Sequence, residues 1–116
     1  RYQEALSGIE GIEFMPEAGM SNRWLTTLTF DTAKIQTTPA DIIEQLGNEN
    51  IEARPLWKPL HRQPLFKGAA FYPHDDKGSV CCDLFQRGLC LPSGSSMTPA
   101  EQYRVIQIVA DRIKYK

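Results

Sequence analysis

The side chains best suited to binding a ligand are concentrated in the stretch "EARPLWKPLHRQPLF", which runs from Glu52 to Phe66. It combines two arginines, one lysine and one histidine with a tryptophan, a phenylalanine and three prolines. Cationic side chains bind carboxylates and phosphates, and an aromatic ring can stack on a base or on the face of a sugar. Because proline breaks helices and cannot donate a hydrogen bond to a sheet, we expect a stiff, irregular segment that is neither a plain helix nor a central strand.

A complete catalytic set is not visible in the rest of the sequence. His61 has no cysteine or carboxylate at metal-ligand spacing, and His74 opens an "HDD" run, through Asp76, that is more typical of a solvated loop. The glycine patterns of phosphate-binding and dinucleotide-binding loops do not occur. The "PSGSS" run lacks the strand-then-helix context of a nucleophile elbow. The sequence therefore predicts that the chemistry of this chain is incomplete.

The three cysteines, Cys81, Cys82 and Cys90, match neither a disulfide framework nor a zinc-binding pattern. We expect all three to be buried and to act as small hydrophobic side chains. Free thiols of this kind fit a reducing compartment, so the sequence favours a cytoplasmic location.

Length and composition are those of one globular domain spanning residues 1–116, with 41% hydrophobic and 23% charged residues. A net charge of -1 gives no electrostatic signature of a nucleic-acid or membrane partner. No apolar run approaches the roughly 20 residues that span a bilayer. The chain begins at Arg1, in what looks like the middle of a helix, which suggests a piece of a longer protein.

Helix signals are strongest at two places. Thr38 is a natural N-cap with Pro39 at the first helical position, and the helix should end within 47–50. Thr98 and Glu101 form a capping-box pattern ahead of the longest apolar-periodic segment. The core stripe of that last helix is predicted to be Ile106, Val109, Ala110 and Ile113. Shorter helices are expected over residues 1–6 and over residues 79–87, the latter with Gly88 as its C′ residue.

The remaining segments are predicted to be strands and loops. Strands are expected near 12–15, over 23–31, over 51–56 and at 89–92. In the second of these, one face is expected to carry Trp24, Thr26, Leu28 and Phe30. Pro55 should make the third an edge strand or end its pairing, and residues 58–78 should form a long loop. The alternation predicts an α+β two-layer sandwich with a mostly antiparallel sheet of three or four strands.

Three pieces of the sequence, in this order, carry a family resemblance: "SNRWLTTLTF", "NIEARPLWKPLHRQPLF" and "DLFQRGLCLPSGSSMT". Together with the C-terminal helix they resemble the C-terminal small domain of the DegT/DnrJ/StrS sugar aminotransferases, enzymes with the pyridoxal-phosphate type I fold. The chain looks closest to members that aminate nucleotide-linked 4-keto-6-deoxy sugars, such as those of bacillosamine and perosamine pathways. The resemblance implies an N-terminal domain, absent from this chain, that binds pyridoxal 5'-phosphate and supplies the Schiff-base lysine.

The resemblance also implies roles for the cationic stretch, which would face the cofactor and the sugar nucleotide when the small domain closes over the cleft. The substrate-binding residues implied in this way are Arg54, Trp57, Lys58 and His61, with Asn22 and Arg23 where the second strand begins. Other roles stay open at this point. Arg54 could pair only with a surface carboxylate, Trp57 could fill an interdomain interface, and His61 could fix the turn through a loop carbonyl.

Two hypotheses about function follow. In the first, the full-length protein is a cytoplasmic homodimer that transfers an amino group, from glutamate, to a nucleotide-linked keto sugar in surface-polysaccharide or glycan biosynthesis. The chain alone would then be inactive and would partner its own N-terminal domain. In the second, the chain is a free-standing, non-catalytic binding module that uses the same groove for a tRNA or a peptide.

Overall fold

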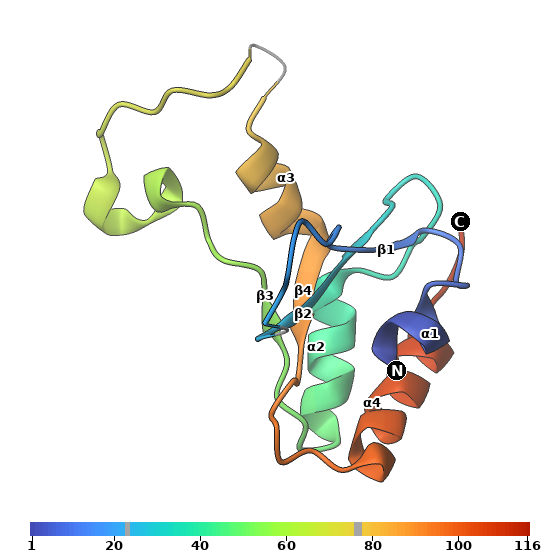
Figure 1. The fold of residues 1–116 in the computed structure, drawn as a ribbon. Helices are drawn as coiled ribbons and strands as arrows, with labels where there is room; N and C mark the ends of the chain where they lie inside the picture. Colours follow the sequence, from blue (N-terminus) through green and yellow to red (C-terminus); the bar gives the residue numbers. More distant parts are fainter. Residues whose placement is uncertain (23, 76–77) are drawn as a thin grey trace.

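A computed structural model describes residues 1–22, 24–75 and 78–116 of the chain. The predicted ligand-binding residue Arg23 and the end of the "HDD" run at Asp76 lie outside the described residues. The described part forms a small sheet with helices packed on it and one long segment that projects away from the sheet (Figure 1).

The sheet has four strands in the order β1-β2-β4-β3, and each neighbouring pair is antiparallel. They span Ile12–Phe14 (β1), Thr26–Phe30 (β2), Arg54–Pro55 (β3) and Gly88–Leu91 (β4). The central strand β4 is buried along its whole length, as its apolar sequence predicts. The predicted α+β class and the four-stranded antiparallel sheet are therefore confirmed.

Four helices accompany the sheet among the described residues. They span Tyr2–Leu6 (α1), Pro39–Asn48 (α2), Val80–Arg87 (α3) and Pro99–Arg112 (α4). Both predicted helix N-termini are confirmed. Thr38 and Thr98 each accept a hydrogen bond from the backbone N–H three residues later, and the acidic side chain at that later position accepts a hydrogen bond from the backbone N–H of the threonine. No helix in the described part of the chain is both long and apolar enough to cross a membrane.

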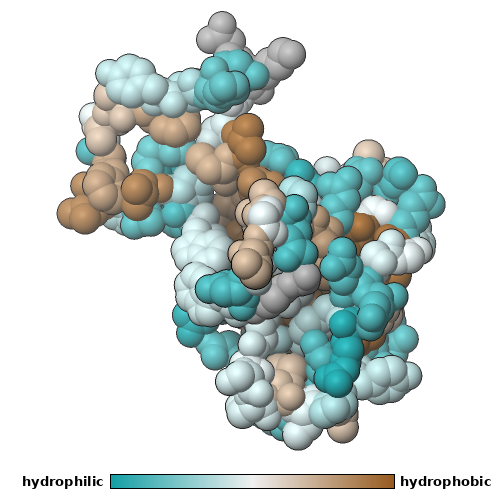
Figure 2. All heavy atoms as spheres, viewed as in Figure 1, coloured by the Kyte–Doolittle hydropathy of each residue, from teal (hydrophilic) through white to brown (hydrophobic). Residues whose placement is uncertain are grey.

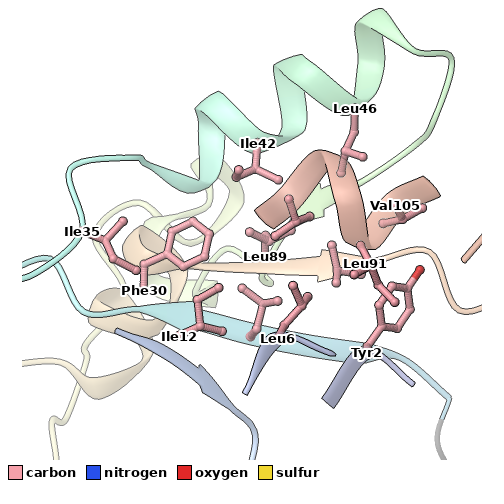
Figure 3. Packing of buried hydrophobic residues seen from close by; sticks show 13 residues of the cluster. Tyr2, Leu6, Ile12, Phe30, Ile35, Ile42, Leu46, Leu89, Leu91 and Val105 are labelled. Carbon is pink, nitrogen blue, oxygen red and sulfur yellow. The ribbon is translucent and has the colours of Figure 1, made fainter. Parts of the chain in front are cut away.

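The hydrophobic core lies between one face of the sheet and helices α1, α2 and α4. Figure 3 shows Ile42 and Leu46 of α2 and Val105 of α4 pointing toward Leu89 and Leu91 of β4. Alternate residues of β2 supply Leu28 and Phe30 to the same cluster, as period-two patterning requires. The core is completed by Tyr2, Leu6, Ile12, Ile35, Ile106 and Val109.

Several predicted boundaries are wrong for identifiable reasons. Strand β2 begins at Thr26, so the alternation does not reach Trp24, whose side chain is 70% exposed. Strand β3 holds two residues instead of six, since Pro55 has no N–H with which to continue the ladder. The loop over 58–78 contains two 3-10 turns, η1 (Leu60–Arg62) and η2 (Pro64–Phe66).

The predicted C′ role of Gly88 is also wrong. Its φ of −121° is ordinary extended backbone, and helix α3 runs directly into strand β4 at this residue. A glycine is needed here for a different reason, because a Cβ atom would lie 2.3 Å from Leu56 Cδ1 and 2.8 Å from the Leu84 carbonyl oxygen. Gly88 thus lets the end of the cationic stretch approach the sheet closely.

Candidate functional site

A shallow groove of about 460 Å³ lies beside β3 and β4, next to the edge of the sheet. In the sheet, Thr27, Cys90 and Arg54 are paired directly across β2, β4 and β3, so they share a face. That face is opposite the one that carries Leu28 and Leu89 into the core. The groove is lined by Trp24, Leu25, Glu52, Ala53, Arg54, Pro55, Trp57, Cys90, Leu91, Pro92 and Ser93.

Two tryptophans stand at this groove. The ring centroids of Trp24 and Trp57 are 6.1 Å apart with the planes inclined at 42°, and the two side chains are 70% and 62% exposed. The alternation pattern placed Trp24 on the core face of its strand, and its pairing with Trp57 across the groove was not foreseen. Large aromatic faces that remain open to solvent are suited to stacking on a flat ligand group.

The guanidinium of Arg54 lies at the rim of the groove and is bound to a carboxylate of the same chain. Its Nε and Nη2 donate to Glu52 Oε1 at 2.8 and 2.5 Å. Both side chains are about three-quarters exposed, and ion pairs of this kind contribute roughly 0–1 kcal/mol. The anion of a ligand can therefore compete with Glu52 for Arg54 at little cost.

Polar side chains near the groove hold its walls in place. The Asn22 side chain accepts a hydrogen bond from the Trp24 N–H at 3.1 Å, which fixes the turn ahead of β2. Ser93 accepts from the Thr26 N–H at 2.9 Å and donates to the Leu91 carbonyl at 3.0 Å. Ser93 thereby ties the start of β2 to the end of β4.

The structure does not bring all the predicted binding residues together. Lys58 is exposed, and its carbonyl accepts a hydrogen bond from the Gln63 side chain at 3.1 Å. His61 does not line the groove. Its ring stacks on Phe71 at 3.7 Å between centroids, and its Nε2 lies 3.3 Å from Cys82 Sγ. The cationic stretch therefore divides into a groove part, with Arg54 and Trp57, and a second cluster around His61.

The prediction that all three cysteines are buried is wrong. Cys90 is buried beneath the groove, and burial raises the pKa of its thiol. Cys81 is exposed and Cys82 is half-buried, because the first turn of α3 faces the projecting segment and not the core. Among the described residues, no cluster of three or more histidine, cysteine or acidic side chains is arranged to hold a metal ion.

Hydrophobic side chains gather on the projecting segment (Figure 2). The exposed large apolar residues of this segment are Trp57, Leu60, Leu65, Phe66, Phe71 and Tyr72. A concentration of apolar side chains on one segment is typical of a surface that contacts another protein part.

Solved structures with this fold are aminotransferases. An aminotransferase from Brucella abortus matches 95% of this chain with a TM-score of 0.71 and 24% identity, and this match covers 28% of its own chain. TlmJ from Streptoalloteichus hindustanus matches 93% of this chain with a TM-score of 0.71 and 18% identity, again over 28% of its own chain. Spr1654 of Streptococcus pneumoniae, named as a sugar aminotransferase, gives a TM-score of 0.73 at 20% identity over 92% of this chain and 27% of its own. The fold is thus that of an aminotransferase C-terminal domain.

The chain belongs to the DegT/DnrJ/EryC1/StrS aminotransferase family, whose model matches residues 1–110. EpsN of Bacillus subtilis (strain 168), named as a pyridoxal phosphate-dependent aminotransferase, is 62% identical over 111 residues. That match covers 94% of this chain and 28% of EpsN. The chain therefore spans a little over a quarter of the length of the relatives that it matches.

Proposed function

We propose that this chain is the C-terminal domain of a pyridoxal phosphate-dependent aminotransferase that transfers an amino group, from glutamate, to a nucleotide-linked keto sugar. Family membership supports the reaction class, and the names of EpsN and Spr1654 support the cofactor and the sugar. Matches to about 28% of each relative support a separate N-terminal domain. The proposal includes a cytoplasmic homodimer that serves surface-polysaccharide biosynthesis.

The observation that carries the proposal is the composition of the groove. It offers two open tryptophan faces and one guanidinium whose present partner is a weakly held surface carboxylate. A sugar nucleotide combines flat ring faces with a diphosphate, and glutamate carries two carboxylates. In the proposal, Trp24 and Trp57 stack on a ring of the substrate, and Arg54 exchanges Glu52 for a ligand anion.

The lysines of this chain do not fit the attachment site of the cofactor. When bound, pyridoxal phosphate carries the amino group between donor and acceptor. A lysine that binds it covalently must be enclosed and readily deprotonated. The described lysines are all exposed, and the hydrogen bond and charge of Glu10 raise the pKa of Lys34. The proposal therefore places the attachment lysine in the N-terminal domain.

The projecting segment supplies the contact with that domain in this proposal. Its apolar side chains would be covered in the full-length protein and exposed in the isolated chain. We expect the isolated chain to self-associate in sedimentation velocity, and Leu65→Ser, which changes an 85% exposed side chain, to reduce this association. A monomer at high concentration with an unchanged profile for the variant would contradict this part of the proposal.

The test of the groove uses the full-length protein and each half-reaction separately. Arg54→Ala is expected to lower kcat/KM by roughly 10- to 150-fold, as the loss of a charge-assisted contact worth about 1.5–3 kcal/mol requires. Trp57→Ala removes a stacking contact worth about 0.5–1.5 kcal/mol and is expected to lower kcat/KM by roughly 2- to 10-fold. A loss confined to the glutamate half-reaction assigns Arg54 to the donor carboxylate. A loss confined to the sugar half-reaction assigns it to the diphosphate. Stopped-flow absorbance of the cofactor measures the rate of each half-reaction.

A control is available among residues that do not line the groove. Arg104 pairs with Glu49 at 2.5 Å, the same distance as Arg54 and Glu52, and its side chain is 54% exposed, against 75% for Arg54. Arg104 also donates to the Glu49 carbonyl at 3.2 Å. Arg104→Ala removes this surface ion pair outside the groove and is expected to leave both half-reactions unchanged. Wild-type rates for Arg54→Ala and Trp57→Ala would refute the binding role. The alternative, a free-standing binding module, predicts that the chain alone binds a ligand and that no amino-group transfer occurs.

A further inference from the structure

The second cluster, where the projecting segment meets α3, has no part in the groove and is centred on the sulfur of Cys82. This sulfur lies 3.3 Å from His61 Nε2. The N-cap residue Ser79 accepts from the Cys82 backbone N–H at 3.3 Å, and its hydroxyl lies 3.0 Å from the sulfur of the adjacent Cys81. A thiol and an imidazole thus meet at one point, although Cys82 and His61 are 21 residues apart in the sequence.

The surroundings of Cys82 favour its thiolate form. Cys82 is the third residue of α3, in the first turn, where the helix dipole stabilises a negative charge. The hydrogen bond from Ser79 lowers the pKa of the Cys82 thiol, and Arg62 lowers it further, while partial burial acts in the opposite direction. Because the thiolate is the nucleophilic form, Cys82 combines access from solvent with activation. Cys81 is more exposed but is not reached by His61 in the described hydrogen bonds.

The same sulfur also holds the projecting segment in place. Among the hydrogen bonds described, the contact of His61 with Cys82 connects the turn η1 to helix α3. The His61 ring also stacks on Phe71, 3.7 Å away between centroids. A substituent on the Cys82 sulfur replaces the thiol proton and adds bulk beside His61, so we expect it to displace His61 from the 3.3 Å contact.

We propose that Cys82 is a site of reversible modification by low-molecular-weight disulfides, and that the adduct releases the projecting segment from α3. The Cys82 thiolate attacks one sulfur of the small disulfide, and a new S–S bond forms as the original S–S bond breaks. The displaced sulfur leaves as a thiolate with the electron pair of the broken bond, so the Cys82 sulfur is oxidised and the displaced sulfur is reduced to the same extent. Excess small thiol reverses the exchange and restores the contact with His61.

The consequence for catalysis rests on the proposed function. The segment that Cys82 holds is continuous with Trp57, which lines the groove. Release of the segment would loosen this wall of the groove and slow the handling of substrate. Cys82 would then couple the aminotransferase to the thiol–disulfide state of its surroundings.

The first experiment measures the reactivity of each cysteine in the full-length protein. Glutathione disulfide is added at pH 7, and peptide mass spectrometry follows the adduct at Cys81 and Cys82. We expect Cys82 to react at least about threefold faster than its more exposed neighbour, because its thiolate fraction is larger. Full unfolding in guanidinium chloride should remove this difference, and Arg62→Gln should reduce it, because the effect of Ser79 remains in that variant. Equal or slower reaction at Cys82 in the folded wild-type protein would overturn the proposal.

The second experiment measures release of the segment. Hydrogen exchange over residues 57–72 should become faster in the modified protein and should return to its original rate with excess glutathione. Cys82→Ser, treated in the same way, should show no change in exchange and no loss of amino-group transfer. Unchanged exchange in a fully modified wild-type protein would refute the release. The mass-spectrometric labelling and the hydrogen exchange decide this proposal without any measurement of activity. Absence of amino-group transfer would count against the proposed function alone.

Discussion

Replacing Gly88 with alanine should strain the junction between α3 and β4 and disturb the groove at the same time. The new Cβ would lie 2.3 Å from Leu56 Cδ1 and 2.8 Å from the backbone oxygen of Leu84. The Leu56 side chain can move, but the Leu84 carbonyl belongs to helix α3 and cannot move without distorting the helix. Since Leu56 lies between Arg54 and Trp57 in the sequence, its displacement carries the groove wall with it.

The expected magnitude combines two opposing contributions. Overpacking of a tight site costs about 1–3 kcal/mol. The φ of Gly88 is accessible to alanine. Because alanine lowers the conformational entropy of the unfolded chain, it should stabilise the folded state by about 0.4–1 kcal/mol in the absence of a clash. The net destabilisation should be about 1–2 kcal/mol, and each kcal/mol lowers Tm by roughly 3–6 °C for a domain of this size.

Thermal unfolding followed by circular dichroism measures the change in stability, and tryptophan emission reports the groove. Trp24 and Trp57 are the two tryptophans of the chain, so a shift of the emission maximum of the folded Gly88→Ala variant reports their surroundings. The Leu56→Ala/Gly88→Ala double variant should be more stable than the sum of the single changes predicts, by at least about 0.5 kcal/mol. Wild-type stability of Gly88→Ala, or strict additivity in the double variant, would refute the close approach.

The remaining predictions concern single positions in the helices. Gly47→Ala, at an exposed helical position with no atom within 4 Å of the new Cβ, should raise stability by about 0.5–1 kcal/mol in the same melts. Thr98→Ala should lower stability at pH 7 by about 1 kcal/mol in urea titrations. Hydrogen bonds from the Thr98 backbone N–H and hydroxyl hold the pKa of Glu101 below its ordinary value of 4.5, so their contribution is present above that pH and is lost on acidification. Thr98→Ala removes only the hydroxyl bond and should partly flatten the decline of stability below about pH 4.5. Burial raises the pKa of Tyr2 from 10.0 to about 12, so the free energy of unfolding should fall as pH rises from 10 toward 12. Tyr2→Phe lacks the hydroxyl that titrates and that donates to the Pro92 carbonyl, so it should abolish this pH dependence in alkaline thermal melts followed by circular dichroism.

The fold could be predicted from the sequence where local signals and burial agree. The capping box of Thr98 and Glu101 and the N-cap Thr38 lie at the predicted residues, because a threonine at the N-cap satisfies a free backbone N–H group of the first turn. The structure adds a second capping box between Thr38 and Asp41. Strand β4 was also predictable, since an apolar run next to a capped helix has few alternatives. The mostly antiparallel sheet was predicted from the alternation of strand and helix signals, although long segments separate the strands that pair.

The candidate site could be predicted only in part, because its geometry depends on contacts between distant residues. Arg54 and Trp57 follow from the composition of one stretch, whereas Trp24 reaches the groove only because β2 pairs with β4 in one register. The contact between His61 and Cys82 depends on how a loop folds back over a helix, which no local pattern encodes. A signal for Cys82 did exist, since a cysteine three residues after a serine N-cap lies in the first helical turn.

The three prolines of the cationic stretch explain why its residues separate into two clusters. Pro55 ends strand β3 and leaves Arg54 and Trp57 beside the sheet. Pro59 precedes η1 and accepts the Arg62 N–H at 2.9 Å, and Pro64 begins η2, so the chain turns away from the sheet before it reaches His61. The groove therefore depends on the packing of Leu56 against Gly88, and the His61 cluster depends on Cys82. Because separate contacts hold the two clusters, changes at Gly88 should alter tryptophan emission, whereas modification of Cys82 should first alter exchange in the projecting segment.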